Sequence, residues 1–367
     1  MSKSKIIKHL NFEEINPPIS NVTKKALIKS SSTNSMRQLY CNEQVGIIEV
    51  YEDNFIEEIK NLSSLLDDYN YIGMDTEFPG TVYSIENPQD DFYYKTLKKN
   101  VDKLKLIQLG ITLTNEKGEY PKNYPYHTWQ FNLKFDKNIE PHKADSINLL
   151  KECGIDFDIL KRKGIKHNIF AQYFMTSNLV LNPDIHWVCF HGSYDFGYLL
   201  RLLINVDLPE REDEFMNDCD TYFINYYDIR ILIKGNDNFQ RGLDKLANQL
   251  KVRREGQIHQ AGSDSIVTID VFFKLKKMGL ITNKKLEELK NIIYGIGQGR
   301  DNDETICYTQ IGGGINYQNN NVNNLMYVNI PLNSNYMNMN YYNYPLMVNN
   351  QNNNLSLHKS NSLQTSI

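Results

Sequence analysis

Two acidic residues, Asp75 and Glu77, end a short apolar run in the segment Tyr71–Gly80. In a β-strand, side chains repeat every second residue, so both carboxylates would project from the same face. At the end of a buried strand they repel each other, and each raises the pKa of its neighbour. A hard cation such as Mg²⁺ or Mn²⁺ relieves this repulsion because it prefers oxygen ligands. The pair therefore indicates a metal site, although two solvated surface acids would show the same spacing.

Three further residues extend this set. Asp195 follows the apolar run Ile185–Phe190 at the start of a predicted helix, where it could instead be an N-cap. His259 and Asp264 lie where a loop enters the last strong helix. A surface histidine and a first-turn acid favoured by the helix dipole would also explain them. Together, however, the residues form four carboxylates and one base at strand ends and helix starts, where α/β sheets form ligand crevices.

Four carboxylates and a histidine are the groups that two-metal phosphodiester hydrolysis requires. Two cations about 4 Å apart would neutralise the acids and bridge the scissile phosphate, and they would assist both the attacking water and the leaving 3′ oxygen. A neutral His259 would take the proton from that water. We therefore expect a site for two divalent cations, Mg²⁺ or Mn²⁺, held by the four carboxylates: Asp75, Glu77, Asp195 and Asp264.

Other catalytic patterns do not occur in the sequence. The run Gly295–Gly299 does not follow a strand and open a helix, so it is not a dinucleotide-binding fingerprint. The sequence contains no Walker lysine motif, no Gly-x-Ser-x-Gly elbow and no cysteine–histidine zinc spacing.

A formal net charge of −4 also argues against a protein that holds nucleic acid by bulk charge alone.

Strands interleaved with helices must position these residues, and this order predicts an α/β architecture. The apolar patterns predict strands near 71–77, 104–113, 127–135, 185–190 and 227–233, of which the first three would form an antiparallel meander. Helices are expected near 55–66, 145–153, 165–178, 243–250 and 263–277. The polar stretch 87–103, with its aromatic residues at 92–94, is expected to be a surface excursion.

Composition divides the 367 residues into three parts. Residues 1–41 lack periodicity and are expected to be a flexible extension. Residues 42–299 form the predicted folded domain. From residue 300 to 367 the chain is Asn-rich, with 17 Asn among the 40 residues from 315 to 354, and we expect a disordered tail.

Localisation signals are few. The first residues lack the apolar core of a signal peptide, and no apolar run is long enough for a membrane span. Five cysteines, an odd number without metal spacing, are expected to be free thiols in a reducing compartment. We therefore expect a soluble intracellular protein that does not associate with a membrane.

Three motifs resemble the histidine subclass of the DEDD-type 3′→5′ exonucleases. They are Met74–Gly80, Tyr194–Leu199 and His259–Ser265. More narrowly, they are similar to the CCR-four-associated factor one (Pop-two) family of mRNA deadenylases, which are catalytic subunits of the CCR–NOT complex. The resemblance extends over about residues 45–299.

The resemblance implies a ribonuclease-H-like fold with a mixed sheet of five or six strands flanked by helices. It implies a poly(A)-specific 3′→5′ exoribonuclease that releases 5′-AMP, shortens mRNA tails and thereby leads to mRNA decay and translational repression. Asp75, Glu77 and Asp264 would bind one metal, and Asp75 with Asp195 the other. Glu77 and Phe78 would lie beside the terminal 3′ nucleotide.

The family likeness also implies partners: poly(A) RNA, the NOT scaffold subunit and a second deadenylase subunit, with residence in the cytoplasm and nucleus. Two alternatives remain open at this point, an exonuclease with broader RNA or DNA substrates and a non-catalytic scaffold subunit. Single-stranded RNA is usually held by stacking and backbone contacts. The aromatic residues at 92–94 and the basic residues Lys251, Arg253 and Arg254 are candidates, although a packed cluster and a solvated loop are the simpler interpretations.

Overall fold

The computed structural model describes residues 40–42, 44–85, 91–236 and 238–300, and the backbone of 306–311, 314–319 and 326–327. The predicted flexible extension therefore lies almost entirely outside the described residues and stays a prediction. Within the described part of the chain, none of the helices combines the length and apolar character needed to cross a lipid bilayer.

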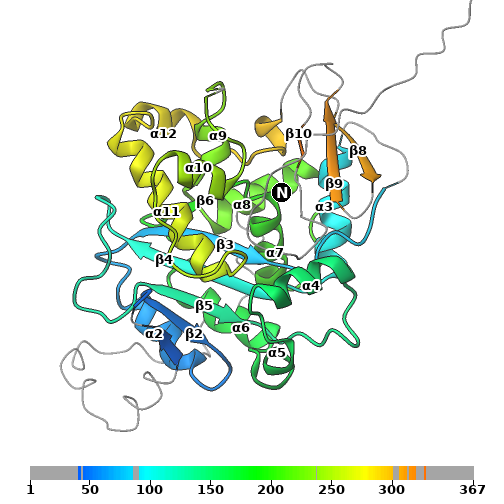
Figure 1. Cartoon of the computed structure of the whole chain (residues 1–367), viewed down its shortest axis with the longest axis horizontal. Helices are drawn as coiled ribbons and strands as arrows, with labels where there is room; N and C mark the ends of the chain where they lie inside the picture. Colours follow the sequence, from blue (N-terminus) through cyan, green and yellow to red (C-terminus); the bar gives the residue numbers. More distant parts are fainter. Residues whose placement is uncertain are drawn as a thin grey trace, which may run out of the picture.

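A mixed seven-stranded sheet with the order β1-β2-β5-β4-β3-β6-β7 forms the centre of the described domain (Figure 1). The strands are β1 Cys41–Asn42, β2 Ile47–Val50, β3 Tyr71–Glu77, β4 Gln108–Thr114, β5 Thr128–Asn132, β6 His186–Cys189 and β7 Tyr226–Asp228. The predicted antiparallel meander of β3, β4 and β5 is confirmed. β6 and β7 extend the sheet beyond β3 in parallel, and β2 lies parallel to β5.

Helices flank both faces of this sheet (Figure 1). They are α2 Phe55–Ser63, α3 Phe92–Lys103, α4 Ala144–Glu152, α5 Phe157–Lys163, α6 His167–Met175, α7 Ser193–Ile204, α8 Glu212–Tyr222, α9 Ile229–Leu232, α10 Leu243–Gln249, α11 Ala261–Lys277, α12 Asn283–Leu289 and the short 3₁₀ helix η3 Gly297–Gly299. The predicted α/β class with a mixed sheet is therefore confirmed, although the sheet has seven strands where the resemblance implied five or six.

Apolar side chains of the meander pack on one face of the sheet. Ile72 and Met74 of β3, Ile111 of β4, and Trp129 and Phe131 of β5 are completely buried, together with side chains of α2, α3, α6 and α7. Removal of this apolar surface from water is the main favourable contribution to folding. It also fixes the strand register, because a slip by one residue would turn these side chains to the opposite face.

The opposite face of β3 and β4 is covered by α11, which approaches the strands closely. A Cβ atom at Gly73 would lie 2.4 Å from the carbonyl oxygen of Ser265, and one at Gly110 would lie 1.9 Å from that of Ala261. Both distances are far below van der Waals contact, so only glycine fits at these two positions. The register pairs Asp75 with Gly110 and Glu77 with Gln108, so this contact lies directly beside the two acids.

The predicted surface excursion at 87–103 is wrong for its described residues, since Phe92–Lys103 form helix α3. Tyr94, Leu97 and Val101 are buried with the i, i+3, i+7 spacing of a helical face. Three lysines between these positions hid the pattern in the sequence. Because Phe92 and Tyr94 are buried, neither is a free stacking platform for RNA.

The strand predicted at 227–233 is only partly correct, because β7 ends at Asp228 and the short helix α9 follows. The Asp228 side chain accepts a hydrogen bond from the backbone N–H of Arg230 (2.9 Å) and so caps this helix. Apolar residues continue past Asp228 because α9 is buried, so hydrophobic pattern alone could not distinguish helix from strand.

Three short strands, β8 Ile306–Ile311, β9 Gly314–Asn319 and β10 Met326–Tyr327, form a separate antiparallel sheet. They lie in the segment that the sequence predicts to be a disordered tail, and their backbone is extended and paired. The rest of that tail lies outside the described residues. For those residues disorder stays a prediction.

The close packing of α11 predicts that Gly110→Ala is strongly destabilising. The added Cβ would overlap the backbone of Ala261, which cannot move without shifting α11, so we expect a loss of about 3 kcal/mol in the free energy of unfolding, at the upper end for overpacking. Urea unfolding followed by circular dichroism measures it. Gly242→Ala is the matched control, because its Cβ would meet no atom closer than 3.9 Å. Equal midpoints for the two variants would contradict the prediction.

Candidate active site

Strand β3 presents Asp75 and Glu77 on the face that α11 covers. They alternate with Gly73, whose missing Cβ admits the helix, and both side chains are half-buried. Met74 and Thr76, which alternate with these residues along β3, point to the other face of the sheet and are buried. The predicted shared face of the two acids is therefore confirmed.

Helix α11 and the loop before it bring His259 and Asp264 to the same place. Asp264 lies in the first turn of the helix, and its Oδ2 accepts a hydrogen bond from the backbone N–H of His259 (3.0 Å). His259 has a left-handed backbone, with φ of 58°. One potential ligand atom from each of Glu77, His259 and Asp264 lies within 4.8 Å of the other two. The structure thus joins residues that are nearly 190 positions apart in the sequence.

Asp195 reaches the site from the opposite side of β3, through helix α7. It is not the N-cap, a position that Gly192 occupies; it lies in the first turn and is 8% exposed. Its Oδ1 accepts a hydrogen bond from the Thr76 hydroxyl at 2.5 Å, which ties α7 to the strand between the two acids. The interpretation of Asp195 as a helix cap is therefore wrong.

Burial and mutual repulsion dominate the electrostatics of the four acids. Desolvation is the largest cause that raises the pKa of Asp75, and the charges of Asp264, Asp195 and Glu77 raise it further. Desolvation likewise raises the pKa of Glu77, followed by the charges of Asp264 and Asp195. The same burial raises the pKa of Asp195 to about 7. Such a set of oxygen donors, too close to ionise together, fits hard divalent cations.

Arg254 enters this site, although the sequence suggested only a solvated loop or an RNA backbone contact. Its Nη1 lies 2.6 Å from Oδ1 of Asp264, and it also pairs with Asp244. Burial raises the pKa of the Asp264 carboxyl, and the guanidinium opposes this shift. Arg254 precedes His259 by five residues in a loop without periodicity, so the sequence carried no signal for the contact.

Phe78 continues from the acids into an aromatic cluster. Its ring stacks on Tyr194 and Tyr198, with ring centroids 5.1 Å and 5.0 Å apart. Phe78 is half-buried, so part of the ring remains accessible beside Glu77. The cluster links the end of β3 to the first turns of α7 and gives the site an apolar wall.

The raised pKa of Asp75 predicts how the metal-free protein responds to pH. A carboxyl whose pKa is higher in the folded than in the unfolded chain contributes stability below its unfolded pKa of about 3.9, and this stability is lost as pH rises. In chelator, Asp75→Asn should therefore melt at a higher temperature than the wild type at pH 8, and the difference should shrink towards pH 4. Thermal unfolding at both pH values measures it.

Asp68→Asn is the control for this measurement, because Asp68 is an exposed acid outside the site. It should melt like the wild type at both pH values. A melting temperature of Asp75→Asn at or below that of the wild type at pH 8 would show that repulsion among the four acids does not limit stability.

Comparison with known proteins identifies close relatives. Residues 50–173 match the family described as CAF1 family ribonuclease. The chain is 41% identical over 263 residues to probable CCR4-associated factor 1 homolog 7 of Arabidopsis thaliana, covering 70% of this chain and 95% of the relative. It is 37% identical over 257 residues to poly(A) ribonuclease pop2 of Schizosaccharomyces pombe, covering 68% and 75%.

Solved structures agree with this similarity. The Mg²⁺- and Mn²⁺-bound form of S. pombe Pop2p superposes with a TM-score of 0.65 at 36% identity, covering 68% of this chain and all of that one. Yeast CAF1, co-crystallised with the NOT1 MIF4G domain, gives a TM-score of 0.60 at 28% identity, covering 69% and 98%. The segment that matches the family, residues 50–173, includes Asp75 and Glu77. The chain therefore belongs to the CAF1 family of ribonucleases.

Proposed function

We propose that this ribonuclease is a poly(A)-specific 3′→5′ exoribonuclease that shortens mRNA tails and releases 5′-AMP. The proposal depends above all on the convergence of Glu77, His259 and Asp264 within 4.8 Å. Asp195 lies close enough for its charge to raise the pKa values of both Asp75 and Glu77. The substrate follows from the S. pombe relative, which is named a poly(A) ribonuclease.

The four carboxylates would hold two divalent cations, Mg²⁺ or Mn²⁺. The structure of S. pombe Pop2p with Mg²⁺ and Mn²⁺ bound supports this choice of metals. Asp75, Glu77 and Asp264 would hold one ion, and Asp75 with Asp195 the other. Bound metal would activate water and neutralise charge at the phosphate and the leaving 3′ oxygen. These acids repel one another and supply the oxygen ligands that these ions prefer.

His259 would act as the general base that takes the proton from the attacking water. The hydrogen bond from its backbone N–H to Asp264 holds it against the metal ligand, and its ring nitrogen lies within 4.8 Å of carboxylate oxygens of Glu77 and Asp264. Glu77 and the accessible part of Phe78 would contact the terminal 3′ nucleotide, Phe78 by stacking against the sugar or base.

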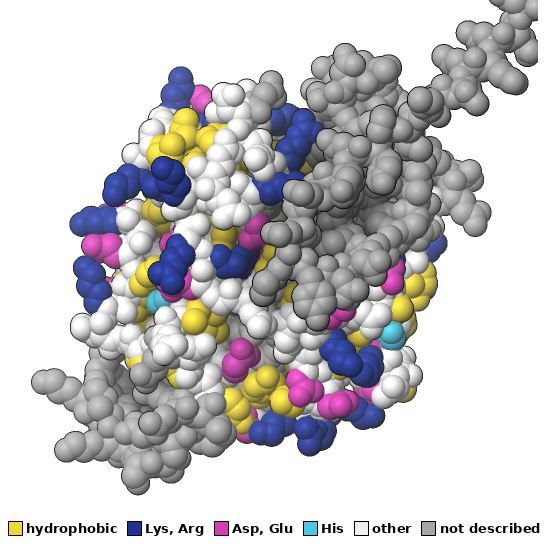
Figure 2. Space-filling view, viewed as in Figure 1, with side chains coloured by type: hydrophobic (Ala, Val, Ile, Leu, Met, Phe, Trp, Pro, Cys, Tyr) yellow, Lys and Arg dark blue, Asp and Glu magenta, His cyan; other side chains and the backbone are white. Residues whose placement is uncertain are grey.

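The charge pattern of the surface supports recognition at the site rather than by bulk attraction. On the face shown in Figure 2, Lys and Arg side chains are scattered among Asp and Glu and do not form one continuous band. The net charge of −4 agrees with this distribution. RNA binding would therefore depend on the few nucleotides nearest the metal ions.

We also propose that the protein works as a subunit of a CCR4–NOT complex in the cytoplasm and nucleus. Yeast CAF1, which shares the fold, was crystallised with the MIF4G domain of NOT1. The Arabidopsis relative is named a CCR4-associated factor, which supports association with a second deadenylase subunit. Co-purification of a tagged chain with these two subunits tests the assembly, and their absence from the purified material would contradict it.

The decisive experiment digests 5′-labelled RNAs that end in A, U or C tracts with purified protein, in Mg²⁺, Mn²⁺ or chelator. We expect stepwise shortening of the A tract from its 3′ end with release of 5′-AMP, and no reaction in chelator or with Asp75→Ala. Equal digestion of all tracts, or of DNA, would favour a broader exonuclease. Intact RNA under every condition would favour a non-catalytic scaffold subunit.

Replacement of His259 separates a base from a metal ligand. If His259 is the base, its loss in His259→Ala should lower kcat by roughly 10²–10⁴-fold. The affinity for Mn²⁺, measured by calorimetry, should stay unchanged. His142→Ala is the control, because the His142 ring hydrogen-bonds to the backbone carbonyl of Glu140 and is not one of the residues that converge on the site. An unchanged kcat would remove His259 from the mechanism, and weakened Mn²⁺ binding would make it a ligand.

A further inference from the structure

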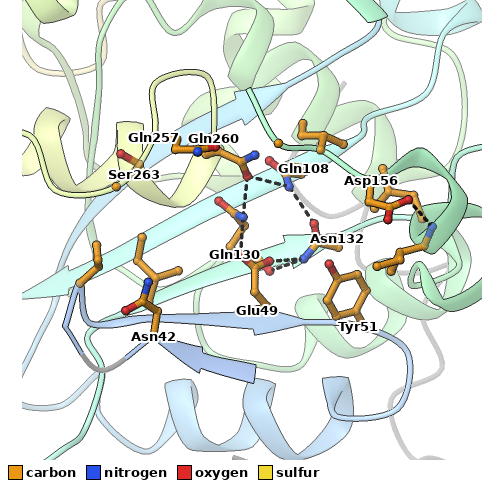
Figure 3. Close-up of a pocket in the computed structure, with 17 residues that line it drawn as sticks. Asn42, Glu49, Tyr51, Gln108, Gln130, Asn132, Asp156, Gln257, Gln260 and Ser263 are labelled. Atoms are coloured by element: carbon orange, nitrogen blue, oxygen red, sulfur yellow. Dashed lines mark hydrogen bonds between the residues drawn. The ribbon is translucent and has the colours of Figure 1, made fainter. Parts of the chain in front are cut away.

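A cleft of about 450 Å³ lies beside the start of α11 (Figure 3). The strand register places its lining residues Gln108 and Gln130 on the face of the sheet that carries the acids. Its lining includes five polar side chains that are hydrogen-bonded to one another: Glu49 of β2, Gln130 and Asn132 of β5, Gln108 of β4, and Gln260, the N-cap residue of α11. None of these is among the expected site residues. We call this group the amide relay.

Glu49 forms one end of the amide relay and accepts at both carboxylate oxygens. Oε1 accepts from Nε2 of Gln130 at 2.8 Å, and Oε2 accepts from Nδ2 of Asn132 at 2.7 Å. Both amides therefore direct their N–H groups towards Glu49. Their carbonyl oxygens must then point away from it, towards β4 and α11.

The side-chain carbonyl oxygens of Gln130 and Asn132 accept hydrogen bonds on the side of α11 and β4. Oε1 of Gln130 accepts from the backbone N–H of Gly262 at 2.8 Å, and Oδ1 of Asn132 accepts from Nε2 of Gln108 at 2.8 Å. Nε2 of Gln130 also donates to Oε1 of Gln260 at 2.9 Å. The relay thus ends at Gly262 and Gln260, which lie between His259 and Asp264.

Gln260 connects the relay to a second wall of the site. Its Nε2 donates to the backbone carbonyl of Cys153 at 2.7 Å, which joins the start of α11 to the end of α4. Gln260 can make this bond only with its Nε2 turned to Cys153 and its Oε1 turned to the relay. The orientation of one side chain therefore depends on that of the others.

We propose that Glu49 is a positioning residue that orients the amide relay and, through it, holds His259 and Asp264 opposite Asp75 and Glu77. The inference rests on the proposed function for the roles of these four residues. A carboxylate suits this position because it only accepts hydrogen bonds, whereas an amide both donates and accepts. The four amides of the relay carry no positive charge that would compete with metal for the acids.

The ionisation of Glu49 follows from the same bonds. Burial raises the pKa of its carboxyl, and the hydrogen bonds from Asn132 and Gln130 oppose this rise. With both oxygens occupied by N–H donors, the bonded form is the carboxylate. Removing its charge or its acceptor character would leave an N–H group facing another N–H group, and one amide would have to rotate.

Glu49→Gln tests the proposal with a side chain of the same shape. One N–H of the new amide would face Nε2 of Gln130 or Nδ2 of Asn132. That neighbouring amide would then have to rotate, and its carbonyl oxygen would no longer accept the hydrogen bond from Gly262 or Gln108. We expect kcat to fall roughly 10- to 100-fold with little change in KM for the RNA, because displacement of a base and a ligand affects the chemical step. The affinity for Mn²⁺, measured without RNA, should fall at least about tenfold, as for other residues that orient ligands.

The double variant Glu49→Gln with Asn132→Asp restores the direction of the relay. The new amide at 49 would donate to the carboxylate at 132, which still accepts from Gln108, while its oxygen accepts from Gln130. Asn132→Asp alone places two carboxylates 2.7 Å apart and should be at least as damaging as Glu49→Gln. Recovery of kcat and Mn²⁺ affinity in the double variant is a result that lost packing would not give.

Glu52→Gln is the matched control, since Glu52 is exposed and pairs with Lys166 away from the site. It should behave like the wild type. Wild-type kcat and Mn²⁺ affinity in Glu49→Gln, or a double variant no better than Glu49→Gln, would overturn the proposal. A wild type that binds Mn²⁺ but leaves RNA intact would instead contradict the proposed function, and the relay would still be tested by metal affinity.

Discussion

The close approach of α11 to β3 and β4 is the contact on which the site depends. Gly73 and Gly110 allow the helix backbone to lie against the strands, and the contact occurs at the strand ends that carry the acids. A larger residue at either position would lift the helix away and separate Asp264 from Asp75. The positive end of the α11 dipole also lies at the site, which favours carboxylates and phosphates there.

Features that depend on the local order of apolar and polar residues were predictable from the sequence. Alternation of apolar residues located β3, β4 and β5, and the order of strands and helices gave the architecture. The five residues expected to do chemistry do converge, because strand ends and helix starts meet at one edge of a sheet. Their individual roles still stand as proposals. The N-cap interpretation of Asp195 failed because its carboxylate pairs with Thr76, more than a hundred residues away in the sequence.

Contacts between distant segments account for what the sequence did not reveal. Arg254 lies in a loop whose composition suggests solvent, and only the folded chain brings it to Asp264. The polar residues of β5 look suited to an exposed face, yet they are covered by the start of α11 and donate or accept in the amide relay. Glu49, at one end of that relay, has no catalytic signature in its own segment. Side chains that position others carry no spacing rule, since their partners are set by the fold.

The buried carboxylate of Asp228 has a consequence for where the folded unit can end. It accepts backbone N–H groups from four residues, His191, Gly192, Arg230 and Tyr294, at 2.9–3.1 Å. The first two form the turn that leads into the helix of Asp195, and Tyr294 lies close to the end of the domain. A chain cut before residue 294 would leave this carboxylate with one donor fewer inside the protein. Tyr294 therefore helps to hold the turn that leads into α7, and a shortened chain that keeps all four donors must extend at least to this residue.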